Sequence, residues 1–171
     1  MSHKLEVWQR GPLPEITPLL QPVAHALLQA REELELYLAE FSDELLWIRP
    51  AGLASVSFHL QHLSGVLDRV FTYARAFGLN EEQFKQLADE DQVFISELST
   101  ANLLARFSAQ VDLAMAQLQT TDPDTLTEYR GVGRAGLPST VIGLLVHAAE
   151  HTMRHVGQLM VTAAVVKNGG M

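Results

Sequence analysis

Apolar residues recur at helical spacing along most of this chain, and the pattern predicts four long helices. Each predicted helix carries its apolar side chains on one face, and the alternation typical of strands is not found. The long helices are expected at residues 15–41, 55–77, 100–119 and 138–166. A shorter helix is expected at 81–90, where Asn80 provides a suitable N-cap.

Breaks between these helices are marked by proline, glycine and capping residues. Ser55 is the expected cap of the second helix, and Gly78 is expected to end it. Residues 121–137 contain several glycines and are expected to form a loop. Their G-x-G-x-x-G spacing does not predict a dinucleotide site, because no strand is expected before it.

Four helices with one apolar face each predict an all-α four-helix bundle. The connection between the first two helices is the shortest, and the later ones, about 20 residues each, leave room for crossovers. Inward-facing residues are expected to include Leu19 in the first helix and Leu113 in the third. At 171 residues, the whole chain (1–171) is expected to be one domain.

Composition excludes several classes of function. The chain has no cysteine, which rules out disulfides, thiolate zinc sites and a cysteine nucleophile. Its net charge of −8 argues against nucleic-acid binding. Neither a membrane-length apolar run nor a hydrophobic signal core at the N-terminus is apparent, so no membrane association and a cytoplasmic location are expected.

Three histidines in the last helix are the strongest chemical signal. His147, His151 and His155 follow one another at intervals of four residues, which turns each side chain by only about 40° from the one before. Two imidazoles at this spacing can share a cation, as in H-E-x-x-H helices. The glutamate of that motif is missing, so the stretch predicts ligands without a general base.

The helical wheel separates these histidines by environment. His151 and His155 lie within the apolar stripe or at its inner edge, whereas His147 lies about 40° further toward the polar face. Inward imidazoles need partners, because a buried polar group without one is costly. Both a metal ion and hydrogen-bonding partners inside a bundle satisfy this requirement.

A second pair of histidines lies in the second helix, at His59 and His62. A catalytic zinc, nickel or iron site usually takes about three protein ligands and leaves a position open. The second helix would have to supply the third ligand. The wheel does not choose between the two, since His59 lies nearer the centre of the apolar face and His62 at its edge.

Two stretches resemble signatures of the DinB/YfiT-like family. Ser55-Val56 followed by His62-Leu63 is similar to the W-S-x(6)-H-L signature, and His151-Thr-Met-Arg-His155-Val-Gly-Gln158-Leu159 resembles H-x3-H-x-G-Q-[LI]. Chain length and helix order agree as well. The resemblance implies one divalent metal ion held by His62, His151 and His155. Ala54 stands where the family usually has tryptophan, a departure expected to affect packing rather than ligation.

Two further residues are candidates for the neighbourhood of the site. Gln158 lies about 20° from His151 on the wheel, so it could donate a hydrogen bond there or simply pack. Arg69 lies seven residues after His62 on nearly the same face and could pair with an anionic substrate group, although an ordinary surface ion pair is the favoured interpretation.

The family resemblance implies a metal-dependent enzyme acting on a small molecule, and its characterised branches include thiol S-transferases and thiol-dependent isomerases. In this hypothesis the metal lowers the pKa of a low-molecular-weight thiol, and the thiolate attacks an electrophile. The lack of a carboxylate in the histidine motif favours a thiol over water as the nucleophile.

Three alternatives stay open from the sequence. One is a hydrolase that uses metal-bound water. Another is a non-catalytic, stress-associated bundle whose metal site is closed by a fourth ligand, with His59 and His147 the candidates. The last is a metal-free structural bundle that forms a homodimer through an exposed apolar face.

Overall fold

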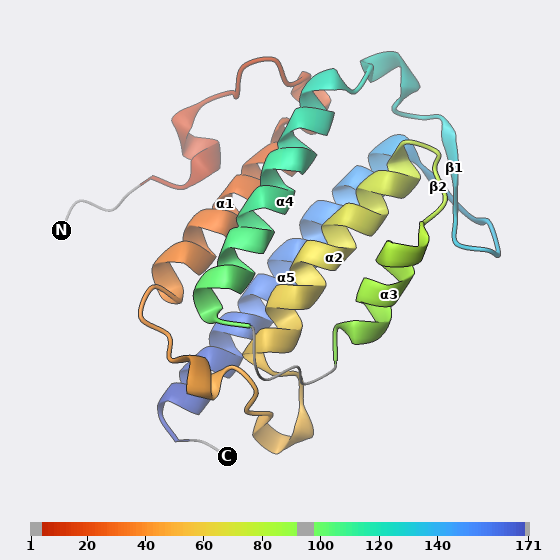
Figure 1. Ribbon diagram of the computed structural model, residues 1–171. Helices are drawn as coiled ribbons and strands as arrows, with labels where there is room; N and C mark the ends of the chain where they lie inside the picture. The colour runs from red at the N-terminus through yellow and green to blue at the C-terminus, as the bar shows by residue number, and fades with distance from the viewer. Residues whose placement is uncertain (1–4, 92–97, 170–171) are drawn as a thin grey trace.

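The computed structural model describes residues 5–91 and 98–169, and four long helices dominate it (Figure 1). The long helices are α1 (Gln21–Tyr37), α2 (Val56–Ala74), α4 (Thr100–Thr120) and α5 (Val141–Lys167), with a shorter α3 (Glu81–Asp89) between α2 and α4. Short 3-10 turns lie at Val7–Arg10, Pro18–Leu20, Asp43–Leu45, Pro50–Gly52 and Pro123–Thr125. The predicted all-α four-helix bundle is confirmed.

The long helices form a closed ring in which α2 and α1 each pack against both α4 and α5. Figure 1 shows α2 and α5 running side by side in opposite directions. Leucine dominates the core of the bundle. The fully buried side chains include Leu20, Leu27, Leu34, Leu60, Leu63, Leu67, Leu103, Phe107, Leu118 and Leu145. Their removal from water is the main force that holds the helices together.

Polar side chains cap the N-termini of four helices. Each cap accepts a hydrogen bond from the backbone N–H three residues further on, which satisfies a donor that the helix leaves free. The caps are Ser55 of α2, Asn80 of α3, Ser99 of α4 and Thr140 of α5. The capping roles predicted for Ser55 and Asn80 are confirmed.

The first helix is shorter than predicted. It begins at Gln21, after the 3-10 turn Pro18–Leu20, instead of at residue 15. The turn has a different period from an α-helix, so Leu19 points outward and is 63% exposed. Leu113, in the middle of α4, is 64% exposed. The inward positions predicted for these two leucines were wrong.

A β-hairpin replaces the loop predicted before the last helix. β1 (Tyr129–Val132) pairs antiparallel with β2 (Leu137–Thr140), and Val132 lies opposite Leu137. Gly133 and Gly136, with φ of 66° and 59°, provide the left-handed backbone that the connecting turn requires. Both strands are short and mostly exposed, so they carry no apolar alternation that sequence reading could detect.

The hairpin also sets the start of α5 and packs against α2 and α5. The helix begins at Val141 instead of residue 138, because Pro138 and Ser139 belong to β2. Arg130 of β1 donates through Nε to the carbonyl of Ala74 at the end of α2, at 2.9 Å. Among the described residues, none of the helices combines the length and apolarity needed to cross a membrane.

Candidate metal centre

Three histidines from α2 and α5 meet between the two helices. His62 comes from α2, and His151 and His155 lie one turn apart on α5. Each of them offers a ring nitrogen, and these nitrogens all lie within 4.8 Å of one another. The Nε2 atoms of His62 and His151 are 2.9 Å apart. We refer to His62, His151 and His155 as the histidine triad.

The ring of His62 is fixed on both sides by its surroundings. Its Nδ1 lies 2.7 Å from Oε2 of Glu90, and Phe58 stacks on the ring with 5.4 Å between centroids. A carboxylate only accepts hydrogen bonds, so Nδ1 of His62 carries a proton and donates it to Glu90, while Nε2 faces the triad. A carboxylate behind a histidine in this way is the usual second partner of a metal-ligating imidazole.

Glu90 is itself held by an ion pair that is buried inside the protein. Arg69 donates through a guanidinium N–H to Oε1 of Glu90 at 2.6 Å, and Arg69 is only 7% exposed. A Cβ at Gly65 would overlap the Glu90 carboxylate and the Arg69 guanidinium. The lack of a side chain at Gly65 therefore lets both charged groups lie close to the backbone of α2. The favoured interpretation of Arg69 as a surface ion pair was therefore wrong: its pair is buried and supports His62.

His59 serves as a partner of His155. Their Nδ1 atoms are 3.0 Å apart, and His59 is buried. One of the two nitrogens must donate, so the contact fixes the ring of His155. His59 does not belong to the group of nitrogens that lie within 4.8 Å of one another among the described residues. The structure thus brings His62, and not His59, into the triad.

The α5 side of the triad is more open to solvent. Arg154 lies 2.6 Å from Nδ1 of His151 through a guanidinium nitrogen. Because guanidinium only donates, Nδ1 accepts and the proton of His151 lies on Nε2, where it faces His62. His147 is exposed and lies 2.8 Å from Glu150. His147, Glu150 and His151 form a second, mostly exposed group whose ligand atoms lie close together.

His151, His155 and His59 are held in the neutral form that a metal ligand requires. Burial, followed by the charge of His62, lowers the pKa of both His151 and His155 to about 4, and Arg154 contributes to each. The same two causes lower the pKa of His59 to about 4. Burial alone would raise the pKa of Glu90, but hydrogen bonds from His62 and Arg69 keep it below its usual value. His59, His151 and His155 are therefore neutral imidazoles, and one ionised carboxylate lies behind His62.

This donor set fits a divalent transition metal. Imidazole suits zinc, nickel and iron, and a metal at about 2.0–2.1 Å from each nitrogen requires nitrogens roughly 3 Å apart. His62 and His151 have this spacing, at 2.9 Å, all three ligand nitrogens lie within 4.8 Å of one another, and the group contains no fourth protein ligand among the described residues. Three ligands leave a position for water or substrate, which is typical of catalytic sites.

Gln158 lies one turn beyond His155, at the mouth of a separate pocket. This pocket of about 440 Å³ is lined by His59, Gln158, Gly157 and Ala54, among others. Ala54 is the residue at the position of the usual family tryptophan, and its small side chain forms part of the wall. Gln158 is exposed and makes no hydrogen bond within the described part of the chain, so its proposed donor role stays a prediction.

Sequence reasoning missed Glu90. The residue follows α3 and reaches His62 across 28 positions of the chain. A single acidic residue near the end of a short helix resembles many others on this chain. The one local hint is Gly65, which leaves space on α2 three residues after His62.

Together, the fold and the triad define a helical bundle whose facing helices could hold one divalent metal ion. The family model of the DinB superfamily matches residues 26–159. The chain therefore belongs to the DinB superfamily, as its two histidine motifs predicted. Among curated proteins, none matches this chain.

Proposed function

We propose that this protein is a divalent-metal-dependent enzyme whose metal is held by His62, His151 and His155. The observation that carries the proposal is the triad itself: three imidazoles converge, and a buried carboxylate orients one of them. A structural site would be expected to have a fourth ligand, and His59 is engaged with His155 instead. The arrangement thus favours an open, catalytic site over a closed one.

We further propose thiol-dependent group transfer as the reaction. When bound, a divalent cation would lower the pKa of a low-molecular-weight thiol and favour its thiolate. One residue of the chain, Glu90, supports a thiol over water as the nucleophile. Both oxygens of Glu90 are engaged, one by His62 and one by Arg69, so this carboxylate orients a ligand and is not free to accept a proton from water.

Hydrolysis is the second candidate, and one observation favours it. Glu150 and His147 form an exposed pair beside His151, and either could accept a proton from a water molecule at the triad. The sequence motif alone contained no such base. The structure therefore weakens the argument that a missing carboxylate favours a thiol over water as the nucleophile. An experiment distinguishes the two reactions.

The test compares turnover of an activated electrophile with and without low-molecular-weight thiols, using protein loaded with zinc, nickel or iron(II). We expect turnover to rise with thiol concentration and to be lost in His62→Ala. Equal turnover with and without thiol would contradict thiol transfer. Loss of that thiol-independent turnover in Glu150→Gln and His147→Gln would then support hydrolysis.

A further inference from the structure

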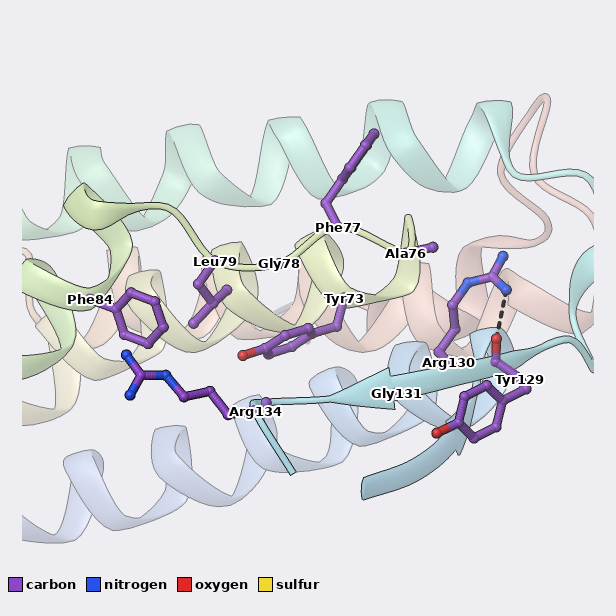
Figure 2. A pocket seen from close by; sticks show the side chains of 11 residues that line it. Tyr73, Ala76, Phe77, Gly78, Leu79, Phe84, Tyr129, Arg130, Gly131 and Arg134 are labelled. Carbon is purple, nitrogen blue, oxygen red and sulfur yellow. Dashed lines mark hydrogen bonds between the residues drawn. The ribbon is translucent and has the colours of Figure 1, made fainter. Parts of the chain in front are cut away.

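Two adjoining pockets lie where the hairpin packs against α2 and α5. The outer pocket has a volume of about 550 Å³ and lies between the end of α2, α3 and the hairpin (Figure 2). The inner pocket, of about 430 Å³, lies between α2, the hairpin and the first turns of α5. Tyr73 and Leu79 line both, so the two pockets share a wall and can form one cleft.

The inner pocket is lined by two residues that connect it to the histidine triad. His147 lines it, and the ring of His147 lies 5.3 Å, centroid to centroid, from that of His151. Arg69 lines it as well, and Arg69 contacts Glu90, the partner of His62. A molecule that fills the inner pocket therefore lies against His147, the neighbour of His151, and against Arg69, which contacts the partner of His62.

The outer pocket contains a cation without an acidic partner. The guanidinium carbon of Arg134 lies 5.9 Å from the centroid of the Phe84 ring, and no described acidic side chain forms an ion pair with it. Arg130 differs, because it bonds to the carbonyls of Ala74 and Tyr129 and to Glu128. Arg134 is thus the arginine of this pocket that remains available to a ligand.

A hydroxyl and several apolar side chains accompany Arg134. The Tyr73 hydroxyl makes no hydrogen bond to any described residue, and Figure 2 shows it pointing toward the end of the pocket where Arg134 and Phe84 lie. Phe77, Phe84 and Leu137 are exposed around the two pockets. Clustered exposed apolar side chains next to a free cation are typical of a binding site for an amphipathic ligand.

We propose that the two pockets form one cleft that binds a small organic carboxylate with an aromatic or extended apolar body. The carboxylate lies against Arg134 and the Tyr73 hydroxyl, because a guanidinium and a phenol both donate to it. The apolar body passes Tyr73 and Leu79, and its far end lies at His147 beside the triad. The proposal rests on the proposed function in one respect only: it identifies the bound carboxylate as the class of substrate that would react at the triad.

The experiment measures binding of biphenyl-4-carboxylate and of its neutral analogue, biphenyl-4-carboxamide, by isothermal titration calorimetry to the full chain. We expect wild type to bind the carboxylate at least tenfold more tightly than the amide. Arg134→Gln should weaken carboxylate binding about tenfold to a hundredfold and leave the amide unchanged, as for a charged hydrogen bond. Arg31→Gln, which removes the same charge from the α1 surface, is the matched control.

Whether the ligand reaches the inner pocket is measured by NMR of the His147 ring protons, whose resonances are assigned with a His147→Gln variant. Biphenyl-4-carboxylate should shift these resonances, whereas the shorter benzoate should leave them unchanged. Equal affinity for carboxylate and amide, an unchanged preference in Arg134→Gln, or an unshifted His147 signal would overturn the proposal. Binding needs no metal, so these outcomes are independent of whether the triad holds one and catalyses a reaction.

Discussion

The two sides of the histidine triad are built differently. On the α2 side, His62 is held by Glu90, and Glu90 by Arg69, in an ion pair whose side chains are both nearly inaccessible. On the α5 side, His151 is contacted by Arg154, and Glu150 lies nearby, but about half of each of these charged side chains is exposed. One side is a fixed scaffold, and the other can rearrange.

This difference indicates a division of roles. A buried carboxylate that orients a ligand removes the cost of arranging it during binding, so the α2 side preorganises the site. Exposed charges on α5 are screened by water and contribute little to stability. They lie on the solvent-exposed side of the triad, so their effects should appear in metal affinity and not in folding.

The largest predicted effect comes from Glu90→Gln. The substitution leaves the buried Arg69 without its charged partner and weakens the hold on His62. We expect the free energy of unfolding to fall by on the order of 3 kcal/mol and zinc affinity to fall about tenfold to a hundredfold. Chemical denaturation and competition with a chelating dye measure the two quantities.

Glu150→Gln is the matched control for that substitution, because it removes the same charge on the exposed side. It should change stability by less than about 0.5 kcal/mol. If both variants lost the same stability and the same zinc affinity, the contrast between the two sides would be wrong.

Gly65→Ala should give the next largest effect. An added Cβ overlaps the Glu90 carboxylate and the Arg69 guanidinium, so we expect a loss of about 1–3 kcal/mol in stability. Gly157→Ala on α5 is the counterpart, since a Cβ there meets nothing within 4 Å. Alanine in a helix should stabilise by about 0.5–1 kcal/mol at that position. Thermal unfolding measures the stability of both variants. Destabilisation of the same size in each would contradict the difference between the two sides.

Acidification should destabilise the metal-free protein. The pKa of His151 and His155 is about 4 in the folded protein and about 6.5 in the unfolded chain. Between these values the unfolded chain binds more protons, so the stability contributed by the neutral rings is complete above about pH 6.5 and lost as the pH falls toward 4. Denaturant titrations at pH 7.5 and 5 should show a smaller drop in the His151→Gln, His155→Gln double variant. An equal drop in both proteins would exclude these rings as the cause.

The smallest effect is expected from Arg154→Gln. Arg154 donates to Nδ1 of His151 and so keeps the proton on Nε2, the nitrogen that faces His62. Removing the arginine frees the other tautomer and removes a nearby positive charge, so zinc affinity should rise a few-fold, as an exposed charge allows. The same chelator competition measures it, and a fall in affinity would show that Arg154 supports the site instead of opposing it.

The parts of the fold and of the site that depend on local periodicity could be predicted from the sequence. The i, i+4 spacing of His151 and His155 on an apolar face predicted their convergence, and Ser55 and Asn80 identified two helix starts. The choice between His59 and His62 required the family resemblance. Both lie on the inner half of one helix, and only the packing of α5 decides which nitrogen enters the triad.

The parts that the sequence did not reveal depend on contacts between distant segments. Glu90 follows α3 and reaches back to His62 on α2, and the ion pair of Arg69 with Glu90 is buried there. The hairpin after α4 has four-residue strands with exposed side chains, so pairing and turn geometry define it and hydrophobic pattern does not. The hairpin matters for the proposed ligand cleft, because it forms a wall of the pocket that contains Arg134.

The most direct test of the account is the metal content of protein purified without an affinity tag, measured by elemental analysis in wild type, His151→Ala and His147→Ala. The account predicts close to one zinc, nickel or iron per chain in wild type. The metal should be lost in His151→Ala and retained in His147→Ala, whose side chain lies outside the triad. Wild-type protein that contains no metal, even after reconstitution, would contradict the metal centre and with it the proposed enzyme.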